Sequence, residues 1–222
     1  MSDFSNIRWI TIDATGTLID PTPSVGHVYG AVLKRHGVEA RHELLQQRFI
    51  EVFRNLSKTP RHFVNEESER KFWRDLALGT VEPWATGIDG DAFFEDAYDA
   101  FARAENWRAP EGADALLRNL KGRGYRLALL SNADGRTRGI LEGLGLAPYL
   151  EQVILSCEVG FEKPDVRLFR GAEKILGATP AEILHVGDSQ RNDGEGPRAA
   201  GWRALVIGRD IDKLVALDKL LS

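Results

Sequence analysis

WITIDATGTL, residues 9–18, is an apolar run that breaks directly into a polar turn. Three further junctions of this kind follow it along the chain. They are SN at 131–132 after LALL, KP at 163–164 shortly after VIL, and GDSQRND at 187–193 after ILHV. Ligands of an open α/β sheet bind outside the carboxyl ends of its strands. We therefore expect the four polar segments to converge on one crevice.

Short apolar runs alternate with helical patterns at the start of the chain and throughout its second half. This alternation is typical of βαβ units, and it predicts a doubly wound, mostly parallel, Rossmann-like α/β sheet. The expected strands are residues 8–12, 126–130, 152–155, 183–186 and 204–207, and the expected helices are residues 112–121, 136–144, 165–176, 194–200 and 210–221.

Residues 21–107 differ, because their apolar side chains repeat at helical spacing and form no convincing strand. Proline-containing segments at 21–23 and 108–112 provide stiff, non-helical connections on entry and on exit. The sequence therefore predicts a core domain of residues 1–20 and 108–222, with residues 21–107 inserted as a helical bundle.

The composition excludes several classes of protein. The 222 residues carry 29 Lys and Arg against 33 Asp and Glu, a net charge of −4, so we expect no nucleic-acid partner. No apolar stretch approaches the length of a membrane span, and residues 1–5 lack the basic and apolar parts of a secretory leader, so we expect no membrane partner. Cys157 is the only cysteine, which excludes an intramolecular disulfide and favours a cytoplasmic location. Nothing in the sequence indicates the oligomeric state.

Three aspartates supply carboxylates to the predicted crevice. Asp13 ends its strand, where a carboxylate can attack phosphorus and form an aspartyl phosphate. A lone Asp at that place would equally well cap a turn. Asp188 and Asp193 lie five residues apart in one loop, so both can reach the crevice, and Mg²⁺ is commonly held by one or two carboxylates plus a substrate phosphate. Alternatively, Asp193 caps the following helix.

Lys163 supplies the positive charge. Pro164 restricts Lys163 to extended geometry and suits the first turn of the next helix, so the ammonium is expected at a helix start, near the nucleophile and a bound phosphoryl group. The bland alternative is a solvated surface lysine. Gly16 permits a tight turn whose backbone N–H groups can face an anion.

In order and content, the four segments resemble the motifs of the haloacid dehalogenase (HAD) superfamily of aspartate-nucleophile hydrolases, which are mostly phosphatases. The resemblance implies that Mg²⁺ is held by Asp13, by Asp188 and by the backbone carbonyl of Thr15. It further implies that Asp193 supports the metal, either directly or through another group.

The same resemblance assigns the phosphate contacts. It implies that the Ser131 hydroxyl binds the phosphoryl group and that Asn132 assists through its amide or its backbone. The inserted bundle stands where the family carries its helical cap, which closes over the active site.

Thr15 departs from the commonest form of the pattern, because most phosphatases of the family carry a second Asp two residues after the nucleophile. A phosphate ester of an aliphatic alcohol expels a basic alkoxide, so a positioned acid contributes about 10²- to 10⁴-fold in rate. Thr cannot donate that proton at neutral pH. The superfamily's phosphotransfer pumps also carry Thr here, and their leaving group needs no protonation.

The leading interpretation is a Mg²⁺-dependent phosphohydrolase that acts on a small phosphorylated molecule through an aspartyl phosphate. One alternative is a metal-independent hydrolytic dehalogenase, against which Asp188 argues. Another is a catalytically weak phosphate-binding or interaction protein. No pattern in the sequence identifies the substrate. The basic cap residues that could hold it are Arg35, Arg41, Arg48, Arg61 and Arg70. Trp73 and Trp84 are interpreted as cap core rather than as a surface that binds substrate.

Overall fold

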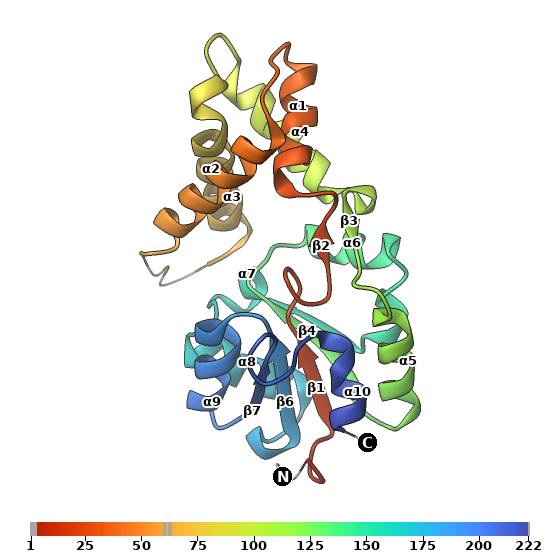
Figure 1. Cartoon of the computed structure of the whole chain (residues 1–222). Coiled ribbons are helices and arrows are strands. Elements are labelled where there is room, and N and C mark those ends of the chain that lie inside the picture. The colour runs from red at the N-terminus through yellow and green to blue at the C-terminus, as the bar shows by residue number, and fades with distance from the viewer. Residues whose placement is uncertain (1–3, 60, 62–63, 222) are drawn as a thin grey trace.

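Five parallel strands form the centre of one half of the molecule in the computed structural model, which describes residues 4–59, 61 and 64–221. Their order is β5-β4-β1-β6-β7, so the chain crosses from β1 to one side of the sheet and later returns to the other (Figure 1). The predicted α/β fold is confirmed, and each strand end lies within one residue of its expected position. The strands are β1 (Trp9–Ile12), β4 (Arg126–Ser131), β5 (Gln152–Leu155), β6 (Ile183–Gly187) and β7 (Arg203–Val206).

Helices cover both faces of this sheet because successive side chains of a strand point to opposite faces. In β1, Ile10 and Ile12 join the hydrophobic core under α5 (Ala113–Gly122) and α6 (Arg136–Gly143). Trp9 joins the other core, under α8 (Val166–Leu176). The sheet is thus buried on both sides, and only the ends of its strands remain for ligands.

Two expectations about helix positions are wrong in detail. The predicted closing helix 210–221 is a turn followed by η6 (Leu214–Ala216) and α10 (Leu217–Leu220). Its first part is diverted because Gly208 adopts φ +81° and its N–H donates to the carbonyl of Ile211 at 2.7 Å. Helix α8 begins at Val166 after the N-cap Asp165, so Pro164 precedes the helix and does not lie in its first turn.

Four helices form a third hydrophobic core, in the part of the chain between β2 (Asp20–Pro21) and β3 (Trp107–Arg108), two strands that pair antiparallel at the base. This helical bundle lies over the carboxyl ends of the strands and is called the cap below (Figure 1). Its third helix starts with a capping box, in which the Ser68 N–H donates to Asn65 Oδ1 and the Asn65 N–H donates to Ser68 Oγ, each at 2.8 Å. The cap helices are α1 (Val25–Arg35), α2 (His42–Leu56), α3 (Glu66–Val81) and α4 (Gly90–Ala102).

Short helical elements complete the described part of the chain. The segment expected as helix 194–200 is divided into a π-helical turn and a four-residue helix. No helix in the described residues is both long and apolar enough to cross a membrane. The short elements are η1 (Glu82–Trp84), η2 (Ala104–Asn106), η3 (Ala147–Tyr149), α7 (Ser156–Val159), η4 (Pro180–Glu182), η5 (Gln190–Glu195) and α9 (Gly196–Ala199).

Candidate active site

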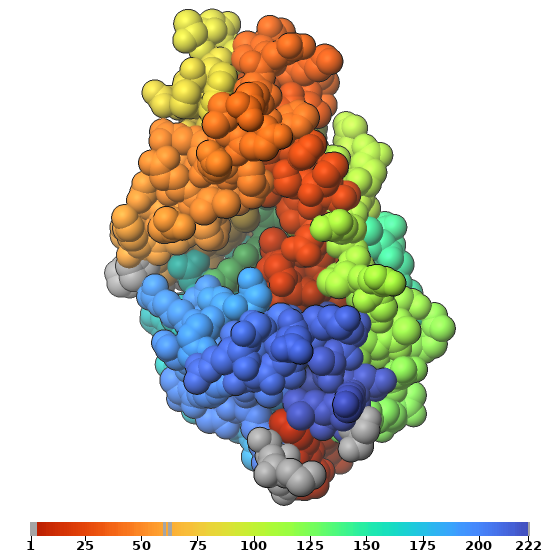
Figure 2. Space-filling model, in the orientation of Figure 1, coloured from red at the N-terminus to blue at the C-terminus, as the bar shows by residue number. Residues whose placement is uncertain are grey.

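A cavity of about 960 Å³ lies between the cap and the carboxyl ends of β1, β4 and β6. In the space-filling view the surface is hollowed between the orange cap helices and the blue half of the sheet domain (Figure 2). All eight site residues predicted from the sequence line this cavity. They are Asp13, Thr15, Gly16, Ser131, Asn132, Lys163, Asp188 and Asp193.

Asp13 and Lys163 form a buried ion pair at the base of the cavity. Lys163 Nζ lies 2.6 Å from Asp13 Oδ1 and 2.6 Å from Asp193 Oδ1, and it also donates to the carbonyl of Leu130 at 3.0 Å. Asp13 is 7% exposed and Lys163 is 3% exposed. Burial alone would lower the pKa of Lys163, but the Asp13 and Asp193 carboxylates outweigh it and raise that pKa above its ordinary value. The ammonium is therefore a fixed positive charge beside Asp13.

Asn132 fixes the backbone of Lys163 from both sides. The Lys163 N–H donates to Asn132 Oδ1 at 2.7 Å, and Asn132 Nδ2 donates to the Lys163 carbonyl at 3.0 Å. Both ends of the Asn132 amide are thus directed at the lysine, across 31 residues of sequence. Its backbone remains for the phosphate contact expected from the sequence.

Asp193 lies at the centre of a buried hydrogen-bond chain that the sequence interpretation missed. Asp193 Oδ1 lies 3.0 Å from His185 Nε2, and His185 Nδ1 lies 2.8 Å from Thr11 Oγ1. Because an ionised carboxylate only accepts, Nε2 carries the imidazole proton. Burial would raise the pKa of Asp193, but Lys163 and His185 hold it well below the usual range. The sequence did contain a sign of this chain, because one polar residue, Thr11 or His185, stands inside each of two apolar strands. In the sheet these two residues are register partners.

Asp188 completes a cluster of three carboxylates. Asp13, Asp188 and Asp193 each offer an oxygen, and these oxygens lie within 4.8 Å of one another. Burial, with the charges of Asp13 and Asp193, raises the pKa of Asp188 to about 6. Three carboxylates share the one ammonium of Lys163, and such a group of oxygen donors fits a divalent cation such as Mg²⁺.

The three carboxylates differ in their hydrogen-bond partners. Asp193 accepts from Lys163 and His185 through Oδ1 and from the Ser189 N–H through Oδ2 at 2.9 Å. Its oxygens are therefore occupied by the protein. Asp13 and Asp188 are therefore better placed than Asp193 to donate to a metal.

Two glycines allow the carboxylates to approach so closely. A Cβ on Gly16 would lie 2.6 Å from Asp188 Oδ2, and Gly16 adopts φ +86°. A Cβ on Gly187 would lie 2.3 Å from Asp193 Cγ. The Gly16 N–H itself donates to the carbonyl of Ile19 at 3.1 Å, so the expectation that backbone N–H groups of this turn face an anion concerns the neighbouring residues of the turn. Gly16 acts at this site by leaving space.

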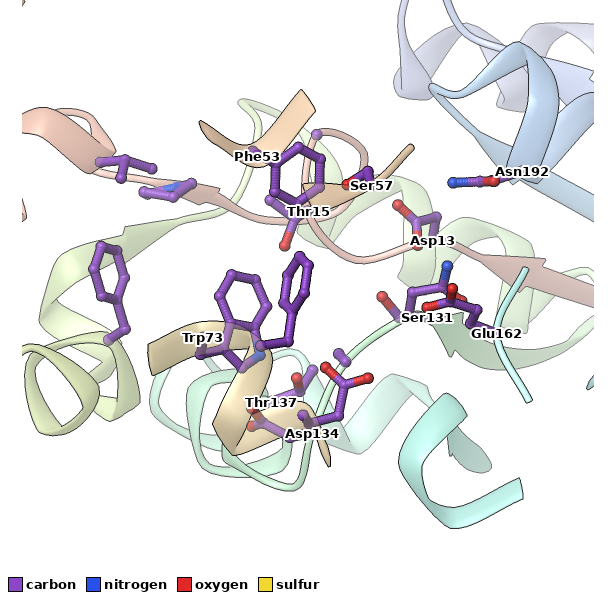
Figure 3. Close-up of a pocket in the computed structure, with 18 of the residues that line it drawn as sticks. Asp13, Thr15, Phe53, Ser57, Trp73, Ser131, Asp134, Thr137, Glu162 and Asn192 are labelled. Atoms are coloured by element: carbon purple, nitrogen blue, oxygen red, sulfur yellow. The ribbon is translucent and has the colours of Figure 1, made fainter. Parts of the chain in front are cut away.

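The remaining two predicted residues flank Asp13. Ser131 is buried at the carboxyl end of β4, and Thr15 has an exposed side chain in the turn after β1. Figure 3 shows Phe53 beside Thr15, and Trp73 on the far side of Thr15 as seen from Asp13. Position 15 therefore stands between the nucleophile and the aromatic part of the cavity.

Residues from the cap close the cavity through ion pairs with the sheet domain. Arg61 Nη2 lies 2.5 Å from Glu162 Oε2 and 3.0 Å from Glu69 Oε1, and burial raises the pKa of Glu69. Of the five cap arginines proposed from the sequence, Arg61 lines the cavity among the described residues. The other four form surface ion pairs. These are Arg35 with Asp96, Arg41 with Glu43, Arg48 with Glu51 and Arg70 with Glu95.

A second contact between the halves was also missed. Arg136, at the start of α6, pairs with Asp134 at 2.7 Å and donates to the backbone carbonyl of Tyr98 in the cap at 3.2 Å. Its guanidinium carbon lies 3.5 Å from the centroid of the Tyr98 ring. Nearby, the Gly135 N–H donates to Glu66 Oε1 at 3.0 Å. Such contacts join residues far apart in sequence, and no local pattern announces them.

Comparisons with known proteins agree with this fold. The haloacid dehalogenase-like hydrolase family matches residues 7–201. The human haloacid dehalogenase-like hydrolase domain-containing protein 3 is 34% identical over 209 residues, covering 91% of this chain and 82% of its own, and a Thermus thermophilus phosphoserine phosphatase is 29% identical, covering 92% and 90%. The structure of the HAD-hydrolase YfnB from Bacillus subtilis, bound to magnesium, superposes with a TM-score of 0.81 at 19% identity, covering 97% of this chain and 98% of that one. This chain belongs to the haloacid dehalogenase-like hydrolase family.

Proposed function

We propose that the protein is a Mg²⁺-dependent phosphohydrolase that acts on a small phosphorylated molecule through an aspartyl phosphate on Asp13. One observation carries the proposal: Asp13 lines the cavity between the cap and the sheet domain, with one oxygen held 2.6 Å from the Lys163 ammonium, inside a cluster of three carboxylates. The similarity to a phosphoserine phosphatase also supports a phosphohydrolase.

Asp13 performs the first step. Because Lys163 engages Oδ1, the attacking atom is Oδ2, which forms a bond to phosphorus while the bond from phosphorus to the leaving oxygen breaks. The electron pair leaves with that oxygen. The Lys163 ammonium and the Ser131 hydroxyl hold the phosphoryl oxygens. Asp13, Asp188 and the Thr15 carbonyl would hold a Mg²⁺, and that ion would supply further positive charge.

The second step releases the enzyme. Water adds its oxygen to phosphorus, the bond from phosphorus to Asp13 breaks, and the carboxylate recovers its electron pair as phosphate departs. The water's second proton passes to phosphate or to bulk water. The ion pair of Arg61 with Glu162 and the hydrogen bond from Arg136 to the Tyr98 carbonyl keep the cap over the cavity, which limits premature access of water to the first step.

Thr15 leaves the departing oxygen without a strong proton donor in the first step. Substrates whose leaving groups are stable as anions, such as aryl and acyl phosphates, should therefore react fastest. We expect a broad screen of phosphate esters, run with Mg²⁺ and with excess chelator, to give metal-dependent release of phosphate. Chloride release from haloacids in chelator, without phosphatase activity, would instead favour the dehalogenase alternative and overturn the proposal.

A further inference from the structure

We infer that the cavity selects a phosphate ester whose leaving group is an uncharged aromatic ring with a hydrogen-bond acceptor, and that Trp73 Nε1 donates to this acceptor. The inference rests on the proposed function, because it assigns the phosphoryl group to the Asp13 end of the cavity. It concerns the opposite end, beneath the cap, where the leaving group must lie.

The cap end of the cavity is a wall of aromatic side chains. Phe53 remains 41% exposed, and Phe72 and Trp73 are half-buried. Their rings already pack edge to face, with 6.1 Å between the Phe53 and Phe72 centroids and 5.4 Å between those of Phe72 and Trp73. Aromatic pairs of this geometry are favourable beyond the area they bury, so a flat ring fits better here than an aliphatic chain. The lining aromatic residues also include Tyr29, Phe49, Tyr98 and Phe101.

The charges at this end disfavour an ionic leaving group. Among the described residues, eight acidic and four basic side chains line the cavity. Arg61 and Arg136, the basic residues at the junction of cap and sheet domain, are each paired with carboxylates at 3.0 Å or less. Lys163 is held by Asp13 and Asp193, and Arg191 is exposed. Arg61 Nη1 has no hydrogen-bond partner among the described residues, but Glu69 and Glu162 already offset the charge of this guanidinium. A second anionic group would thus enter a region whose buried cations are offset by carboxylates, at a cost in desolvation.

The indole N–H of Trp73 is the polar group that points to an acceptor on the leaving group. Its indole Nε1 is buried and has no hydrogen-bond partner within the described part of the chain. A buried donor without a partner is costly, by about 1–3 kcal/mol, and such groups call for an explanation. Trp73 lines the cavity, on the far side of Thr15 from Asp13 (Figure 3). Nε1 itself has almost no accessible surface, so a ligand that offers an acceptor here would satisfy the donor as the indole turns toward the cavity.

Non-hydrolysable phosphonates test this recognition by calorimetry in Mg²⁺ buffer, so the readout does not depend on turnover. Benzylphosphonate should bind about 3- to 10-fold more tightly than cyclohexylmethylphosphonate, which has a similar size but no aromatic ring. 4-Acetylbenzylphosphonate should bind about 3- to 10-fold more tightly than its 4-isopropyl analogue, which lacks the acceptor. The 4-carboxy analogue should bind about 10-fold more weakly than the acetyl compound.

Two variants locate the donor. Trp73→Phe keeps an aromatic ring but removes the N–H, so it should erase the advantage of acetyl over isopropyl while retaining the preference for benzyl. Trp84→Phe is the matched control, because Trp84 is also half-buried against the cap core but does not line the cavity. It should keep both preferences.

The outcomes separate this inference from the proposed function. Metal-dependent turnover of phosphate esters with equal binding of benzyl and cyclohexylmethyl phosphonates would overturn the inference alone. So would an acetyl advantage that survives Trp73→Phe. Absence of both phosphonate binding and phosphate-ester turnover would overturn the proposed function and the inference together.

Discussion

Lys163→Met should destabilise the protein strongly, because it removes the one cation from a buried group of carboxylates. The ammonium lies 2.6 Å from Asp13 Oδ1 and 2.6 Å from Asp193 Oδ1, and its side chain is 2% exposed. Breaking a buried ion pair by deleting one partner costs about 3–5 kcal/mol, because the other charge stays behind unpaired. For a chain of this size, that loss lowers the melting temperature by roughly 6–20 °C.

Lys71→Met is the matched control. Lys71 Nζ also lies 2.6 Å from a carboxylate oxygen, that of Asp75, but its side chain is 74% exposed. An exposed pair with this spacing on a helix contributes about 0.3–0.5 kcal/mol. The two variants therefore compare the same ion-pair distance at opposite extremes of burial.

Urea unfolding followed by tryptophan fluorescence, in chelator so that no metal replaces the lost charge, measures both losses. In the parent, Asp193 has a depressed pKa, so its contribution is present at neutral pH and is lost as pH falls through that folded-state value. Without Lys163 this carboxyl should instead protonate readily. The penalty of Lys163→Met should therefore be largest near pH 7 and shrink below about pH 4. Equal losses in the Lys163 and Lys71 variants would refute the reasoning, as would a penalty that does not change with pH.

Three further predictions concern the chemistry. Asp13→Asn should abolish turnover and also the thermal stabilisation that beryllium fluoride with Mg²⁺ gives the parent, since it removes the attacking oxygen; an Asn variant with the parent rate would exclude Asp13 as nucleophile. Thr15→Asp should raise kcat/KM for alkyl phosphates more than for aryl phosphates, by up to about 10²-fold if the new carboxyl reaches the leaving oxygen. If the parent rate does not depend on leaving-group basicity while chemistry is rate-limiting, another proton donor, such as Glu69, must act instead. In chelator, the raised pKa of Asp188, about 6, means that ionisation of this carboxyl costs stability, so the free energy of unfolding should fall as pH rises from about 4 to about 6. Asp188→Asn or added Mg²⁺ should flatten this fall. An unchanged pH curve in both cases would contradict the prediction.

The fold was predictable from sequence because its signals are local. Short apolar segments of four or five residues predicted all five strands of the main sheet, and helical spacing predicted the bundle inserted after the first strand. The closing helix was wrong because periodicity does not register a turn that depends on Gly208 and on a bridge between Ile207 and Ile211. Only the folded chain brings those groups together.

The site was predictable where its residues follow strands, and it was not where they meet across the fold. The ends of parallel strands share one edge of the sheet, so Asp13 and Asp188 could be placed near each other from sequence alone. The hydrogen-bond chain from Thr11 through His185 to Asp193 needed the register of β1 and β6 and the path of the turn after β6. Trp73 was interpreted as cap core, and it does pack there; its second face, toward the cavity, follows from how the cap sits on the sheet.

The hydrophobic core of the cap draws its buried residues from positions 25–100, and the two cores of the sheet domain draw none from that interval. Each half can therefore tolerate changes in its interior without repacking the other. Substitutions that reshape the cap can alter which molecules are accepted while leaving the Asp13 and Lys163 geometry untouched. A family built in this way can diversify its substrates by exchanging one half, and a hybrid carrying a relative's cap should retain the chemistry of this chain with the relative's selectivity.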